Sequence, residues 1–184
     1  MKIGKQLASV LLACVLIMPI GVSGCNSLSD ATRAQNAITA VLQIAKAELP
    51  AIPMQDQAAY TNWVNLGISL DTQLGTCITG VSGLMGKGAQ FAACFTAFAT
   101  GFLSPAELAQ LRLLNPVTQG KVQLYATAAI TAVNLAIALW GGTAQPAPVV
   151  TTPPASSEMF NLCIEVAART GGSCDQRALA AAGY

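Results

Sequence analysis

The chain has 184 residues, of which 53% are hydrophobic and only 9% are charged, with nine basic and eight acidic side chains. Two of the basic residues, Lys2 and Lys5, lie at the extreme N-terminus, so the rest of the chain is close to neutral. A phosphate-binding surface needs clustered lysine and arginine, and their absence excludes nucleic acid as a partner. The sequence has no histidine, so it lacks the commonest general base and zinc ligand.

The N-terminus has the pattern of an export signal. Lys2 and Lys5 precede an apolar stretch from Leu7 to Ile20, and the small residues 22–24 lead directly into Cys25. Residues 1–26 resemble the signal peptide of a bacterial lipoprotein, ending in a lipobox. The resemblance implies cleavage between Gly24 and Cys25, and a diacylglycerol on the Cys25 thiol. An ordinary secretory signal and a retained single-pass anchor are the alternatives.

The same resemblance implies a location. An aspartate after the modified cysteine commonly retains lipoproteins in the inner membrane, and this chain has Asn26 there. We therefore expect the outer membrane, on its periplasmic side, if the source has two membranes. No polybasic patch supplements the lipid, so the acyl chains at Cys25 must hold the protein to the bilayer.

The cysteine count is typical of an oxidising compartment. Cys14 belongs to the signal and Cys25 to the lipid, which leaves four cysteines and three possible pairings. Metal binding is disfavoured because neither a C-x-x-C spacing nor a histidine is present. Two pairs are natural ones: Cys77 with Cys94, equidistant from a glycine-rich turn between two helices, and Cys163 with Cys174, on either side of Gly171-Gly172.

The helical spacing of apolar residues, interrupted by prolines and glycines, predicts an all-α fold. The sequence has no internal repeat. We expect a tether at 25–29, a bundle of about five helices at 30–140, an extended proline-rich linker at 141–157, and a disulfide-stapled helical hairpin at 158–184. The hairpin is too small to have a core of its own, so it must lean on the bundle or on a partner.

Apolar stripes predict how the first two helices pack. In the first helix, 30–49, residues Ala34, Ile38, Val41 and Ala45 recur at helical spacing. The second helix is expected to start near Gln55, with this apolar face: Ala59, Trp63, Leu66, Leu70, Leu74, Cys77 and Val81.

The third helix, 89–103, carries no charge and has four phenylalanines on one stripe: Phe91, Phe95, Phe98 and Phe102. Such a stripe is typical of a core. The alternative is that it lines a cavity, which would make the protein a carrier of apolar ligands.

Ser104-Pro105 with Glu107 is a strong start for a short fourth helix, and a long helix is expected from Thr118 to Trp140. Its segment Val122 to Trp140 has no charge and is long enough to span a membrane. Against a span, a polar stripe made by Gln123, Thr127, Thr131 and Asn134 indicates a face turned to solvent or a partner.

No catalytic pattern accompanies these helices. The acidic residues, Asp56 and Asp71 among them, are scattered singly, which charge–dipole stabilisation and solubility explain. We expect no catalytic residues, no metal and no cofactor. The leading hypothesis is a lipid-anchored envelope protein that acts as a non-enzymatic scaffold or interaction module for a protein partner. The oligomeric state is left open.

Overall fold

The computed structural model describes residues 28–81, 88–140, 142, 143, 145, 156–171 and 174. These residues form six α-helices and a short 3-10 helix, with no strand among them. The expected leader and lipobox, most of the linker and the expected last helix at 175–182 lie outside the described residues. The helices are α2 (Leu28–Ala47), α3 (Met54–Val81), α4 (Gly88–Phe102), α5 (Pro105–Leu111), α6 (Pro116–Leu139) and α7 (Ser156–Thr170), with η1 at Leu49–Ala51.

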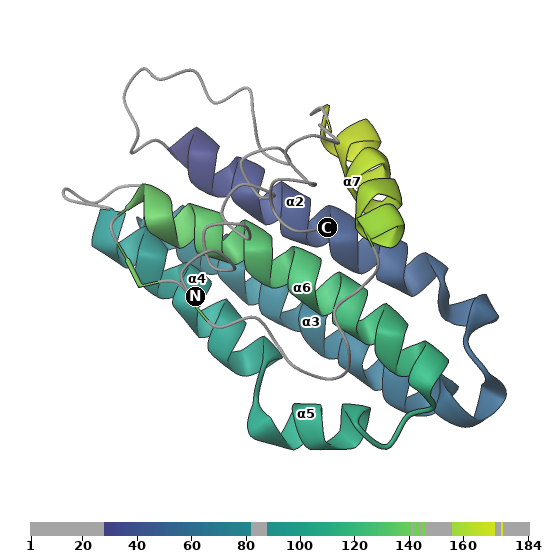
Figure 1. Cartoon of the computed structure of the whole chain (residues 1–184). Helices are drawn as coiled ribbons and strands as arrows, with labels where there is room; N and C mark the ends of the chain where they lie inside the picture. Colours follow the sequence, from purple (N-terminus) through teal and green to yellow (C-terminus); the bar gives the residue numbers. More distant parts are fainter. Residues whose placement is uncertain are drawn as a thin grey trace, which may run out of the picture.

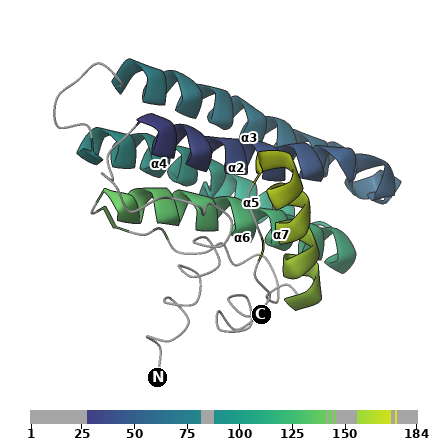
Figure 2. The same cartoon turned by 90° about the horizontal axis from the view of Figure 1, so that it is seen from above.

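Four of the helices form an up-down-up-down bundle, which confirms the predicted all-α fold. Helices α2, α3, α4 and α6 pack in a ring, in which each contacts the next most extensively and α6 closes the ring against α2. Figures 1 and 2 show successive members running in opposite directions, with α5 in the connection between α4 and α6. Short connections of this kind favour antiparallel neighbours.

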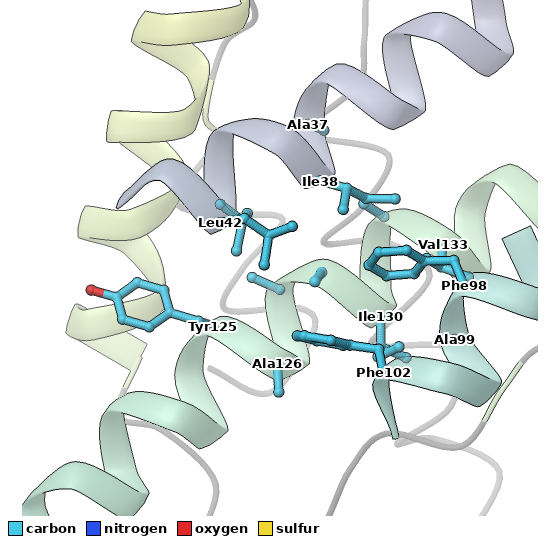
Figure 3. Packing of buried hydrophobic residues seen from close by; sticks show 14 of the residues in the cluster. Ala37, Ile38, Leu42, Phe98, Ala99, Phe102, Tyr125, Ala126, Ile130 and Val133 are labelled. Atoms are coloured by element: carbon cyan, nitrogen blue, oxygen red, sulfur yellow. The ribbon is translucent and has the colours of Figure 1, made fainter. Parts of the chain in front are cut away.

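The core fills the centre of this ring. On α2 the predicted stripe is confirmed, since Ala34, Ile38, Val41 and Ala45 are all buried. Figure 3 shows Ile38 and Leu42 of this helix facing side chains of α4 and α6. Alanines such as Ala37, Ala99 and Ala126 lie among these bulky side chains, which allows close packing.

Local capping fixes where the shorter helices begin. Ser104 caps α5 by accepting a hydrogen bond from the Glu107 N–H at 3.4 Å, as predicted. Asn115 caps α6 through a 3.0 Å hydrogen bond from the Thr118 N–H. Helix α6 therefore starts at Pro116 rather than at Thr118, because proline fits the first helical position.

The predicted face of α3 is partly wrong. Trp63 and Leu74 are buried, but Cys77 is exposed, and Tyr60, Val64 and Ile78 are buried instead. The buried residues of α3 do form a single stripe, but this stripe includes Gly67 and the polar residues Asp56 and Asp71. A pattern of apolar residues does not select these positions, so the predicted face lies to one side of the observed one.

The polar stripe of α6 also differs from expectation. Gln123, Thr127, Thr131 and Asn134 are buried rather than turned to solvent. Hydrogen bonds compensate part of the desolvation, since Gln123 donates to Thr127 at 2.9 Å. The Asn134 amide pairs with the Gln145 backbone, accepting from its N–H at 2.6 Å and donating to its C=O at 2.8 Å.

Helix α7 leans on the bundle, as its small size required. Leu162, Cys163 and Val166 are buried, and α7 packs mainly against α2 and more lightly against α6. Figure 1 shows it crossing α2 steeply. It begins at Ser156, two residues earlier than predicted, and ends at Thr170. The next residue, Gly171, has a positive φ of 72°, which favours glycine.

Candidate interaction surface

Both predicted disulfides are formed. Cys77 of α3 joins Cys94 of α4 with a Cα–Cα distance of 5.9 Å, and Cys163 of α7 joins Cys174 at 5.8 Å. The first bond ties the two helices together near the turn between them. We call this α3–α4 unit, Met54–Val81 and Gly88–Phe102, the stapled hairpin. It is distinct from the C-terminal hairpin expected at 158–184.

The phenylalanine stripe belongs to the core of the bundle. Phe91, Phe95, Phe98 and Phe102 are each at most 2% exposed. Phe102 stacks on Trp63 at a centroid distance of 5.3 Å, and Phe95 stacks on Trp140 at 5.8 Å. A ligand on this stripe would have to displace aromatic contacts that the fold already makes.

The outer side of the stapled hairpin is uncharged. Within its described residues the charged side chains are Asp56 and Asp71, and both are buried. We call the exposed side chains the hairpin face; on α3 they include Asn62, Asn65, Ser69, Thr72, Gln73 and Thr76, and on α4 they are Ala89, Gln90, Ala93, Ala97 and Thr100. The two helices that carry these side chains, α3 and α4, are neighbours in the ring.

The threonines of this face have already used their hydroxyl protons. Thr72 donates to the Ile68 carbonyl at 3.0 Å, Thr76 to the Thr72 carbonyl at 3.1 Å, and Thr100 to the Thr96 carbonyl at 2.9 Å. A hydrogen bond to the preceding helical turn orients the threonine methyl group outward. If a partner protein covered these threonines, each hydroxyl proton would therefore keep its hydrogen-bond acceptor.

Asp56 and Asp71, which were expected to serve charge–dipole stabilisation and solubility, are both buried, although Asp56 does lie in the first turn of α3. Asp56 Oδ2 accepts hydrogen bonds from the Asn115 backbone N–H at 3.2 Å and from the Thr118 hydroxyl at 2.7 Å, and also from the Asn115 side-chain amide. This aspartate holds the start of α3 to the start of α6. Its partners are about sixty residues away in the chain, so local pattern carried no signal for the contact.

Asp71 lies on α3 against α2. Its Oδ2 is 2.7 Å from the Thr39 hydroxyl oxygen, and its Oδ1 is buried with no hydrogen-bond partner. Burial raises the pKa of Asp71, and hydrogen bonds from Thr39 and Gln35 only partly counteract this.

A small crevice between the end of α2 and the start of α3 has a volume of about 30 Å³, room for about one water molecule. It is lined by Lys46, Leu49, Tyr60, Thr61, Val64 and Asn65. The Tyr60 hydroxyl donates to the Ala45 carbonyl at 2.9 Å. Burial, with smaller contributions from Tyr125 and Glu48, raises the pKa of Tyr60 far above its ordinary value. The crevice is too small for an organic ligand.

Within the described part of the chain, no three histidine, cysteine, aspartate or glutamate side chains gather where they could hold a metal ion. One described helix, α6, is long and apolar enough to cross a membrane, and 89% of its most apolar window is buried inside the structure. The core helix of a water-soluble bundle has the same length and composition.

Comparison of this chain with protein-family models, with curated proteins and with solved structures found no match. Its function must therefore be inferred from its own residues.

Proposed function

We propose that the chain is a lipid-anchored protein of the bacterial cell envelope that binds a protein partner through the hairpin face and has no enzymatic activity. The lipobox-like ending at Cys25 supports the anchor, and two disulfides suit an exported domain. If the source has two membranes, Asn26 supports an outer-membrane position on the periplasmic side.

The uncharged hairpin face is the observation that carries the binding role. Charged residues are depleted in the buried centres of protein interfaces, because a charge loses its hydration when a partner covers it. Exposed charged side chains occur elsewhere on the molecule, at Arg33, Arg112 and Glu165 for example, and Lys46 borders the face, where it lines a crevice with Asn65. The absence of charge among the exposed side chains described on α3 and α4 therefore distinguishes this side of the molecule.

The anchor gives the hairpin face an orientation. Helix α2 starts at Leu28, three residues after Cys25, so the lipid would hold this end of the bundle close to the bilayer. The end of α3 and the start of α4 lie at the same end of the bundle, because α3 is antiparallel to α2. A helix of 28 residues such as α3 is about 42 Å long, so the face would extend from the membrane into the periplasm.

Site-specific photo-crosslinking in cells tests the proposal. A photoreactive amino acid at Ser69 or Ala93, on the hairpin face, is expected to give an adduct with a partner protein. The same amino acid at Gln43 of α2 or Asn161 of α7, which are equally exposed but outside the face, serves as the control. Only monomer at every position, with the protein at normal abundance, would refute the binding role.

A charge on the face gives an independent test. Ser69→Glu and Ala93→Glu should leave the thermal unfolding curve unchanged, because both sites are exposed. Both should weaken partner capture by about tenfold or more, since a buried interface would have to desolvate the new carboxylate. Gln43→Glu is the matched control and should bind normally. Equal capture by all three variants would mean that the partner binds elsewhere.

A further inference from the structure

The Asp71 carboxyl lies in the interface between α2 and α3, where 8% of the residue is exposed. Its Oδ1 has no hydrogen-bond partner, and its Oδ2 contacts the Thr39 hydroxyl oxygen at 2.7 Å. An ionised carboxylate accepts at both oxygens. If it were ionised here, a buried negative charge would face the helix interface with half of its acceptors unused.

The hydrogen positions around Thr39 give an independent argument. Its hydroxyl oxygen is 2.7 Å from Asp71 Oδ2 and also 3.1 Å from the Gln35 backbone carbonyl. A threonine hydroxyl has one proton and can donate it to only one of these acceptors. Thr72 and Thr76 donate theirs to the carbonyl four residues earlier. With an ionised carboxyl, Thr39 can satisfy only one of these two acceptors. If Thr39 donates to the Gln35 carbonyl as Thr72 and Thr76 do to theirs, a proton on the Asp71 carboxyl lets both contacts be hydrogen bonds.

Gln35 completes the surroundings of the carboxyl. Its side-chain amide donates to the Asp71 backbone carbonyl at 3.2 Å. The amide lies over Gly75, where a Cβ would come within 2.5 Å of Gln35 Nε2. Glycine at this position thus leaves room for Gln35, which covers Asp71 from the α2 side.

We propose that Asp71 is a proton-binding site that joins α2 to α3, and that loss of its proton weakens the contact between these helices. In the protonated form the Asp71 carboxyl donates to Thr39 Oγ1, and the Thr39 hydroxyl donates to the Gln35 carbonyl. In the ionised form one of these two hydrogen bonds is lost, and an unpaired charge remains in the interface.

Among the contacts that the structure gives to Asp71, no charged side chain could offset a negative charge on its carboxyl. Helix α2 presents the neutral Gln35 and Thr39 to it, and α4 has no charged residue. Charges on the elements packed against α3 are Asp30, Arg33, Lys46 and Glu48 on or after α2, Glu107 on α5 and Lys121 on α6. Glu48 and Lys121 pair with each other near the start of α3, far from Asp71 along this helix.

The direction of the pH effect follows from linkage. Because burial raises the pKa of Asp71 in the folded protein, the folded state binds this proton more tightly than the unfolded state does. The ratio of folded to unfolded protein should therefore fall as the pH rises above about 4, where an exposed aspartate ionises. One proton can change this ratio by at most about tenfold per pH unit.

The test compares purified, oxidised wild-type protein with Asp71→Asn in urea unfolding between pH 4 and 8. Asparagine has the same shape, cannot ionise, and can donate its amide to Thr39. We expect the wild type to lose stability relative to the variant as the pH rises, with the ratio of their unfolding constants growing by up to about tenfold per unit. Parallel pH profiles for the two proteins would overturn the proposal.

Infrared spectroscopy of the carboxyl and a control variant at Asp56 test the same proposal independently. Infrared spectroscopy of the folded protein should show a protonated carboxyl band at a pH where exposed aspartates are ionised, and Asp71→Asn should lack it. The control is Asp56→Asn, since the Asp56 carboxylate accepts hydrogen bonds from Asn115 and Thr118. This variant should be less stable than the wild type at pH 7 and should keep the infrared band. A wild-type protein without the band would also overturn the proposal.

Discussion

Gly67 shows how tightly single residues are fitted in this core. It faces inward from α3, where a Cβ would lie 2.6 Å from Leu42 Cδ2 and 2.9 Å from Phe102 Cε2. Leu42 and Phe102 are themselves fully packed, at 1% and 0% exposure. Neither can move away without disturbing the α2–α3 and α3–α4 contacts, so the glycine is required by close approach of the helices.

Gly67→Ala should therefore destabilise the protein by about 1–2 kcal/mol, because overpacking outweighs the helix propensity that alanine adds. Gly80→Ala on the same helix is the matched control. Nothing lies within 4 Å of a Cβ at Gly80, so that variant should be more stable than the wild type by up to about 1 kcal/mol. Urea unfolding measures both, and equal effects would contradict the packing at Gly67.

The buried tyrosines predict the behaviour at high pH. Burial raises the pKa of Tyr60 and of Tyr125 well above 10, with nearby glutamates adding to the effect. The folded state thus holds these protons more tightly than the unfolded state, so stability should fall as the pH rises above about 10. Spectrophotometric titration should show two of the three tyrosines ionising only as the protein unfolds. Ordinary titration of all three in the folded protein would contradict this account.

At the scale of elements, the Cys77–Cys94 bond secures the stapled hairpin. The two cysteines are 17 residues apart, and closing a loop of that length restricts the unfolded chain by about 3 kcal/mol on the chain-entropy account. Cys77 is exposed and Cys94 is buried beside the phenylalanine stripe. The bond therefore ties a surface position on one helix to the core side of the next.

Replacing both cysteines, Cys77→Ser with Cys94→Ala, should lower the free energy of unfolding by about 3 kcal/mol. Chemical denaturation measures the change. The control is the Cys163→Ser/Cys174→Ser variant in its reduced form. It should match the stability of a variant in which all four disulfide-forming cysteines are replaced. A denaturation midpoint unchanged by loss of Cys77–Cys94 would show that the α3–α4 contacts alone hold the hairpin.

Apolar periodicity located the buried faces that consist mainly of apolar residues. The faces of α2 and α4 are of this kind, and both were located correctly, as Ile38 and Phe95 illustrate. The buried stripe of α3 includes Asp56 and Asp71, so the apolar pattern misplaced Cys77 and missed Tyr60. Both disulfide pairs could be predicted. Antiparallel helices bring Cys77 and Cys94 together, since they are equidistant from a turn, and Cys163 and Cys174 lie on either side of Gly171-Gly172 in the sequence.

The buried polar groups could not be predicted, since their partners are far away in the chain. Thr39 and Asp71 are 32 residues apart, and Asp56 meets Thr118 across 62. A polar residue at helical spacing looks the same whether it faces water or such a partner. The hairpin face was only partly foreseen: the absence of charge on α4 was evident, but which side chains are exposed on α3 required the fold.

At the scale of the whole molecule, the account combines a lipid at Cys25 with a bundle whose own helices bury α6. Cys25→Ser removes the site of acylation, so the variant should leave the membrane fraction and appear as soluble protein after cell lysis. A variant that stays in the membrane through a carbonate wash would instead favour α6 as a spanning helix. Gly120→Ala, which changes α6 where nothing contacts a Cβ, is a control that should remain anchored.

The most direct measurement for the central claim is intact-mass spectrometry of the protein extracted from its native membrane. The account predicts a chain that begins at Cys25 and carries the mass of a diacylglycerol on this residue, with or without an acyl group on the new amine. A free thiol at Cys25, on a chain that keeps its leader or is cut at another residue, would contradict the lipid anchor and the orientation of the hairpin face derived from it.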